Sequence, residues 1–260
     1  MKSFVVDEFL PAGLFVLYGF YSNGYGHILT KVGKSLLTLD LCLSIAQGKP
    51  FLGFNTNKCD VVYCVDESGR NEDLRRIKER MQKQGIKDKI AGNLIILPEA
   101  IGLRADFALL VDEIMKENPN TNLICIDAFG YVRDKKDMRI LQEITLRYKH
   151  LTMLLVHDNI KISGADADGV LILNKQEVTD KHVTLARIMK EVENKEYQLY
   201  LDTNTLKWVN LGIKDKQHVK IVPQIARYLD KVWRNDNSSN KLYSIYVFGI
   251  EDKKTTKNKE

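Results

Sequence analysis

The sequence predicts an α/β protein with a mostly parallel sheet that is covered by helices on both faces. Two observations lead to this fold class. Short, wholly apolar runs alternate along the chain with longer amphipathic segments, a pattern typical of parallel sheets that are buried on both faces. Polar or acidic residues also follow most of these runs directly. Because parallel strands end at one common edge, where open α/β sheets bind ligands, a functional site is expected there.

Six apolar runs predict the strands of this sheet. They cover residues 14–18, 61–65, 94–97, 122–126, 151–156 and 170–173. The segments between them have helical periodicity or length and predict helices over residues 36–46, 71–84, 106–116 and 138–149. From about residue 183 the pattern changes. Alternating apolar and polar residues at 196–201 and 207–210 predict a hairpin.

The length of 260 residues fits one large α/β domain with a small appendage. We predict a core over residues 1–182, a hairpin over 183–213 that completes it, and a small extension over 214–250. That extension reads as a helix near 223–233 followed by a last strand within 242–250. The lysine-rich residues 251–260 are expected to be a disordered tail.

Composition limits the classes of protein that this chain can belong to. The formal net charge of +5 is compatible with a polyanionic partner. A long apolar run and a secretory leader are both missing, so no membrane partner is expected. The four cysteines have neither CxxC spacing nor nearby histidines, which argues against zinc and for a reducing, cytoplasmic compartment.

Gly33, Lys34 and Ser35 stand between the first apolar run and the first helix. A nucleoside triphosphate needs inward-facing amides at a helix N-terminus, a lysine for its β- and γ-phosphates, and a hydroxyl for Mg²⁺. The strand, loop and helix order is the one that a P-loop requires. The sequence therefore predicts a site for ATP and Mg²⁺; a chance helix start is the alternative.

The predicted phosphate loop is irregular. The GxxxxGK[ST] pattern requires glycine five positions before Gly33, where Ile28 stands. Joining residues 19–21 directly to 31–35 restores the pattern, which makes residues 22–30 an insertion. The nucleotide-binding residues are then Gly19, Lys31, Val32, Gly33, Lys34, Ser35 and Leu36.

Two carboxylates are candidates for the chemistry beside Lys34. Asp127 follows the fourth apolar run, where it can hold the Mg²⁺ shell together with Ser35; a helix-capping or turn aspartate is the alternative. Glu67 follows the second run and is the candidate for polarising the attacking water, with Asp66 as the alternative. A solvated acidic turn is the simpler interpretation of Asp66 and Glu67.

Three further residues are candidates for supporting roles. His157 follows the fifth run and can sense the γ-phosphate or link it to a DNA-binding loop; a structural histidine is the alternative. Arg187 and Lys190 are candidates for a finger that reaches the nucleotide of a neighbouring subunit, and ordinary surface charges are the alternative.

The chain resembles the RepA-type AAA ATPases, RecA-like relatives of hexameric helicases that plasmids, phages and integrated elements carry. The resemblance rests on residues 10–14, 31–35, 45–53, 62–68, 154–157 and 167–173. It implies a RecA-like core, ATP hydrolysis with Mg²⁺, a hexameric homo-oligomer and contact with single-stranded DNA. It also implies that Glu67 is the catalytic carboxylate and Asp127 the Walker B residue. Asp158 departs from the family, which tends to have a second histidine there.

The main hypothesis is a DNA-dependent ATPase, a replicative helicase of a mobile genetic element. A nucleotide-binding regulatory or scaffold protein of the same fold, with little or no turnover, is the alternative that the P-loop insertion favours. A small-molecule kinase shares the P-loop, but no arginine-rich lid follows the core.

Overall fold

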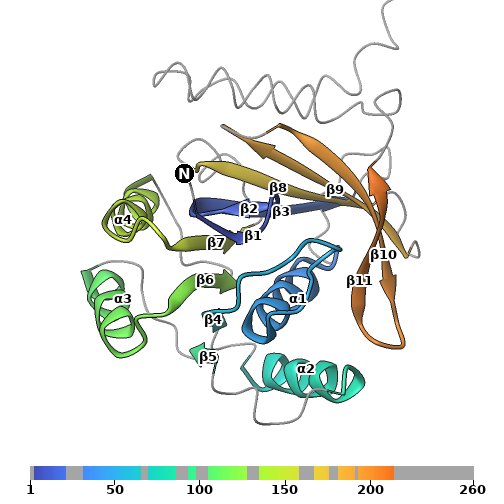
Figure 1. Ribbon diagram of the computed structural model, residues 1–260, viewed down its shortest axis with the longest axis horizontal. Helices are drawn as coiled ribbons and strands as arrows, with labels where there is room; N and C mark the ends of the chain where they lie inside the picture. The colour runs from blue at the N-terminus through green and yellow to red at the C-terminus, as the bar shows by residue number, and fades with distance from the viewer. Residues whose placement is uncertain are drawn as a thin grey trace, which may run out of the picture.

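A nine-stranded mixed sheet forms the centre of the computed structural model (Figure 1), with the strand order β11-β10-β9-β8-β3-β7-β6-β4-β5. The structure describes residues 3–21, 32–65, 70–85, 93–97, 105–127, 135–157, 167–175, 181–190 and 193–213. Helices lie on both faces of the sheet. The α/β fold class that the sequence predicts is confirmed.

All six predicted parallel strands are present and parallel to one another. They are β3 (Gly13–Tyr21), β4 (Asp60–Val65), β5 (Leu94–Leu97), β6 (Thr121–Asp127), β7 (Thr152–Val156) and β8 (Gly169–Lys175). The predicted hairpin is also confirmed, as β10 (Lys195–Asp202) and β11 (Lys207–Ile213). It extends the sheet at one end because β10 pairs with β9 (His182–Met189), which runs antiparallel to β8.

Three strands were not predicted. Thr184 and Arg187 interrupt the apolar character of β9, so no continuous apolar run marks that strand. The short strands β1 (Phe4–Val6) and β2 (Leu10–Pro11) form a separate antiparallel ribbon and are too brief to show a period. Tertiary pairing, rather than local pattern, therefore produces these strands.

The four predicted helices are confirmed with small shifts of their ends: α1 (Lys34–Gln47), α2 (Arg70–Lys83), α3 (Ala105–Glu117) and α4 (Lys135–Arg147). Apolar residues of α1 and α2 join one core cluster, and those of α3 and α4 join the other. One cluster lies on each face of the sheet, which gives three layers (Figure 1).

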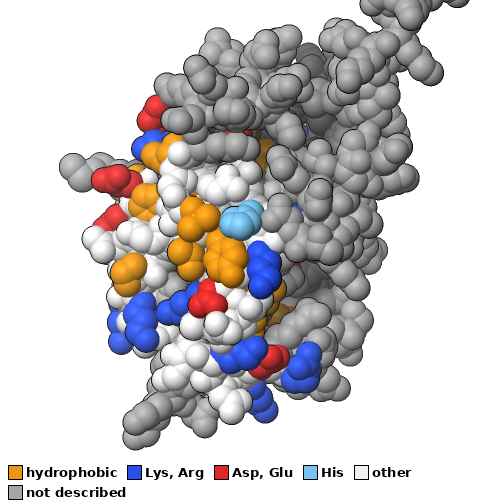
Figure 2. All heavy atoms as spheres, turned by 90° about the vertical axis from the view of Figure 1, so that its right-hand side faces the viewer, with side chains coloured by type: hydrophobic (Ala, Val, Ile, Leu, Met, Phe, Trp, Pro, Cys, Tyr) orange, Lys and Arg blue, Asp and Glu red, His pale blue; other side chains and the backbone are white. Residues whose placement is uncertain are grey.

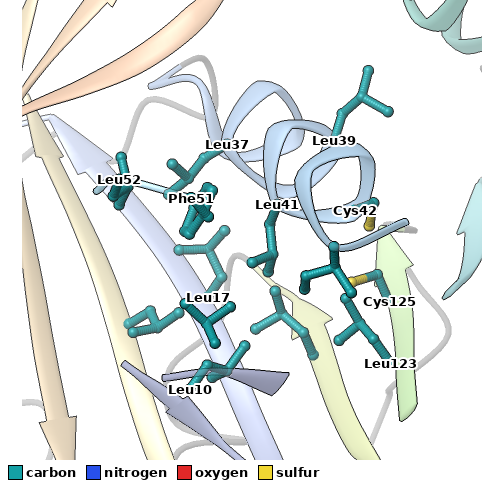
Figure 3. Packing of buried hydrophobic residues seen from close by; sticks show 14 of the residues in the cluster. Leu10, Leu17, Leu37, Leu39, Leu41, Cys42, Phe51, Leu52, Leu123 and Cys125 are labelled. Atoms are coloured by element: carbon teal, nitrogen blue, oxygen red, sulfur yellow. The ribbon is translucent and has the colours of Figure 1, made fainter. Parts of the chain in front are cut away.

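Helix α1 is buried along most of its length. Leu37, Leu41 and Cys42 pack with Leu17 of β3 and Cys125 of β6 in one cluster (Figure 3). The helix ends at Gly48, whose φ of 67° is left-handed and whose amide donates to the Ile45 carbonyl. Because its sides are packed, the position of its first turn relative to the sheet edge is fixed.

The hairpin leaves apolar side chains in solvent. Val209, Leu211 and Ile213 alternate along β11, the edge strand, and are exposed. Figure 2 shows apolar side chains beside a histidine on this side of the molecule. Among the described helices, none is both long and apolar enough to span a membrane. The predictions for residues 214–250 and 251–260 fall outside the described part of the chain.

Candidate nucleotide-binding site

Three predicted site residues lie at the same edge of the sheet. Lys34 begins α1 after β3, Asp127 is the last residue of β6, and His157 directly follows β7. The strand order places β7 between β3 and β6, and all three run in the same direction. The prediction that their carboxyl ends share one edge is confirmed by this topology.

Glycines permit the close approach of β3 and the start of α1. Gly33 has a φ of 97°, a left-handed conformation that side chains disfavour. A Cβ atom on Gly19 would lie 2.1 Å from the Val32 Cγ2 atom and 2.8 Å from the Lys34 Cγ atom. The aliphatic part of Lys34 therefore crosses the end of β3 where only glycine leaves room, and the lysine side chain is buried.

A hydroxyl and a carboxylate meet beside Lys34. The Ser35 hydroxyl donates to the Asp127 Oδ1 atom at 3.2 Å, although the two residues are 92 positions apart. Oxygen ligands of these two kinds are those that Mg²⁺ prefers in proteins. The residues present therefore fit a nucleotide-bound magnesium ion.

Tyr63 orients the Asp127 carboxylate and was missed by the sequence analysis. Its hydroxyl donates to the Asp127 Oδ2 atom at 2.6 Å from the neighbouring strand β4. The two carboxylate oxygens thus face different partners, Ser35 and Tyr63. In the sequence, Tyr63 differs from the rest of its apolar run only by its hydroxyl group. That difference does not reveal the partner of the hydroxyl.

A buried ion pair ties α2 to the second turn of α1, and it was also missed. The Arg80 Nη2 atom lies 3.0 Å from the Asp40 Oδ1 atom, and both side chains are almost fully buried. The Arg80 Nη1 atom also donates to the Leu36 carbonyl at 2.8 Å. Burial lowers the pKa of the Arg80 guanidinium, and the nearby Asp40 carboxylate opposes that shift. The guanidinium thereby holds the backbone next to Ser35.

His157 is buried at the end of β7, and its backbone amide donates to the Leu17 carbonyl of β3 at 3.1 Å. This pairing holds His157 beside the strand that leads to the phosphate loop. Its position is compatible with sensing the γ-phosphate, with linking it to a DNA-binding loop, and with the structural alternative.

Arg187 does not lie where a finger could reach another subunit. Its side chain is 1% exposed, and its guanidinium donates to the carbonyls of Glu8, Phe9 and Glu193. It also lies over the Phe9 ring. The prediction of a trans-acting role for Arg187 is corrected on this ground, because the guanidinium is enclosed within its own subunit.

Lys190 is exposed just after β9, and its amide donates to the Asp168 carbonyl at 3.1 Å. Asp168 directly precedes β8, so Lys190 lies at the sheet edge opposite Gly33. The remaining predicted residues, Lys31, Asp66 and Glu67, and the insertion at residues 22–30, fall outside the described part of the chain.

The site has the features of a P-loop domain. A left-handed glycine and a lysine lie where a helix begins after a parallel strand, and a serine next to them contacts an aspartate. Residues 16–137 match the family model described as an AAA domain. That range begins in β3 and ends in α4, so it includes Gly19, Gly33–Ser35 and Asp127.

Two solved structures resemble the whole described fold. One is a KaiC-like protein from the hyperthermophilic archaeon Pyrococcus horikoshii, with 17% identity and a TM-score of 0.53 over 80% of this chain and 94% of the other. The second is the RadB recombinase, with 14% identity and a TM-score of 0.51 over 78% and 93%. The search of curated proteins found no match. The fold is therefore the RecA-like P-loop fold, as predicted.

Proposed function

We propose that this chain binds Mg-ATP at the edge formed by Gly33, Lys34, Ser35 and Asp127, and hydrolyses it. The contact between the Ser35 hydroxyl and Asp127 carries the proposal. It brings together a hydroxyl from the start of a helix and a carboxylate from the end of a distant strand, directly beside a lysine.

Each residue then has a defined task. The amides that follow Gly33 and the Lys34 ammonium would hold the phosphates. Ser35 and Asp127 would hold Mg²⁺, which would supply positive charge to the transferred phosphoryl group. Tyr63 fixes the orientation of Asp127. Glu67, or Asp66 in its place, accepts a proton from the attacking water. His157 reports the state of the γ-phosphate from the end of β7.

The contact of Gly19 with Val32 and Lys34 supports an intact loop despite the inserted residues. These two ends of the loop lie so close together that a Cβ atom on Gly19 would overlap the Val32 side chain. Closely placed ends are what we expect when an insertion is added to a P-loop and does not replace it.

More specifically, we propose a RepA-type, DNA-dependent ATPase: a replicative helicase of a mobile element that acts in the cytoplasm on single-stranded DNA as a hexameric homo-oligomer. The family resemblance of residues 31–35 and 45–53 supports this, as do the AAA domain match and the net charge of +5. Lys190 is exposed and remains the candidate for the group that reaches a neighbouring nucleotide.

A regulatory or scaffold protein that binds nucleotide without turnover is the second candidate. The insertion at residues 22–30 favours it, because extra backbone beside the phosphates can displace the attacking water without preventing binding. Asp158, in place of the family's second histidine, favours it too, since that position follows His157 directly.

The test measures Mg-ATP binding by calorimetry and phosphate release with and without single-stranded DNA. We expect saturable binding and DNA-stimulated release in the wild type, and loss of release of at least about a hundredfold in Lys34→Ala and Asp127→Asn. Lys149→Ala is the control, because Lys149 is exposed just before β7 at the opposite sheet edge. Binding without release would support the second candidate, and absence of saturable binding would contradict both.

A further inference from the structure

Trp208 of β11 packs against the phosphate loop. A Cβ atom on Gly33 would lie 2.9 Å from the Trp208 Cζ2 atom and 3.5 Å from its Cη2 atom. The indole is 6% exposed, although the neighbouring residue Val209 is in solvent. The predicted hairpin therefore supplies a large, rigid side chain that lies directly on the glycine at the start of α1.

The backbone of β11 is anchored to α1 at Trp208, which sets where the indole lies. The Trp208 backbone amide donates to the Asp40 Oδ2 atom at 2.9 Å, and the other oxygen of Asp40 pairs with Arg80. Two residues further along β11, the Asn210 side-chain amide donates to the Leu52 carbonyl, just beyond the end of α1. These two hydrogen bonds therefore fix the position of β11 relative to α1 and the phosphate loop.

The ring edge that contacts Gly33 is next to the indole nitrogen, because Cζ2 is bonded to the carbon that carries Nε1. Nε1 is buried and has no hydrogen-bond partner among the described residues. An unsatisfied buried donor has a cost of about 1–3 kcal/mol. A buried polar atom of Trp208 therefore lies close to the phosphate loop.

We propose that Trp208 is a positioning residue for the phosphate loop. Its indole holds Gly33 in the left-handed conformation before the nucleotide binds. This inference rests on the proposed function of the same site. Glycine has the greatest backbone freedom, so a loop built on it loses affinity unless something restricts it. The indole provides this restriction from a strand that is far from the loop in sequence.

The first test uses fluorescence. Trp233→Phe leaves Trp208 as the only tryptophan, since the chain has two. We expect its emission to change on titration with Mg-ADP, with the same midpoint as the binding curve that calorimetry gives for this variant. Calorimetric binding with no change in emission would overturn the proposal. Absence of calorimetric binding would overturn the proposed function, and this inference with it.

The second test separates positioning from stability. Trp208→Ala is expected to weaken Mg-ADP binding by about tenfold to a hundredfold, and Trp208→Phe to recover part of it. Leu199→Ala is the matched control, because Leu199 is fully buried on the adjacent strand of the same hairpin. It should lower stability and leave the affinity unchanged. Equal losses of affinity in Leu199→Ala and Trp208→Ala would overturn the proposal. If Trp208→Ala does not fold, the affinity of Trp208→Phe is compared with that of Leu199→Ala in the same way.

Discussion

At the residue scale, the site depends on how single polar atoms face one another at the end of β6. Asp127 accepts hydrogen bonds from Ser35 and Tyr63 through different oxygens. A carboxylate that would otherwise rotate is thereby held with one oxygen toward the phosphate loop. The orientation of this carboxylate depends on both contacts, and only Ser35 of the two donors belongs to the P-loop.

Tyr63→Phe is predicted to raise the Mg²⁺ concentration that half-saturates phosphate release by about tenfold, because a hydrogen bond to a charged group contributes about 1.5–3 kcal/mol. The measurement is a Mg²⁺ titration at fixed ATP. Tyr148→Phe is the control, since the Tyr148 hydroxyl donates to the Asp112 carboxylate in the same way on the other face of the sheet. An equal effect of both changes would contradict the role of Tyr63.

At the element scale, contacts with α2 and β11 hold the first two turns of α1 in place. Arg80 of α2 donates to the Leu36 carbonyl and pairs with Asp40, and the Trp208 backbone amide of β11 donates to the second oxygen of Asp40. The three elements meet at one buried carboxylate. A buried carboxylate such as Asp40 destabilises the folded protein unless a cation, here the Arg80 guanidinium, lies beside it.

Arg80→Leu is predicted to lower the free energy of unfolding by about 3–5 kcal/mol, because it leaves the Asp40 charge buried without its cation. The double variant Arg80→Leu, Asp40→Leu should lose less than the sum of the two single changes. Urea unfolding measures all three. Arg147→Leu, which breaks an exposed pair with Asp112, should change little. Additive losses would show that the pair is not coupled.

At the scale of the whole molecule, the two core clusters enclose every cysteine as a free, buried thiol. Burial raises the pKa of Cys64 to about 12 and that of Cys59 to about 12. An unfolded thiol has a pKa of about 8.5. Below that pH both states are protonated, and above it only the unfolded state ionises. Stability is therefore expected to decline from about pH 8.5 towards pH 12.

Each such thiol is expected to lower stability by up to about 1.4 kcal/mol per pH unit in this range. Urea midpoints at pH 8, 9 and 10 measure the decline, and Cys64→Ala should reduce its slope compared with the wild type. The four thiols should also fail to react with a thiol reagent until the protein unfolds. Rapid reaction of Cys42 or Cys125 in the folded protein would contradict the packing shown in Figure 3.

The sequence by itself determined the parallel strands, their helices and the place of Gly33, Lys34, Ser35 and Asp127. These features depend on local patterns, because an apolar run, a helical period or a glycine before a lysine is legible without knowing its neighbours. The common edge followed from them, since parallel strands end together.

Only the tertiary structure decided which side chains meet. Tyr63 and Asp127 are 64 positions apart, and Trp208 and Asp40 are 168 apart. Such contacts depend on the strand order and on which face each residue occupies, neither of which a local pattern encodes. For the same reason Arg187 resembled a surface charge in the sequence, whereas pairing of β9 with β8 and β10 placed it in the interior.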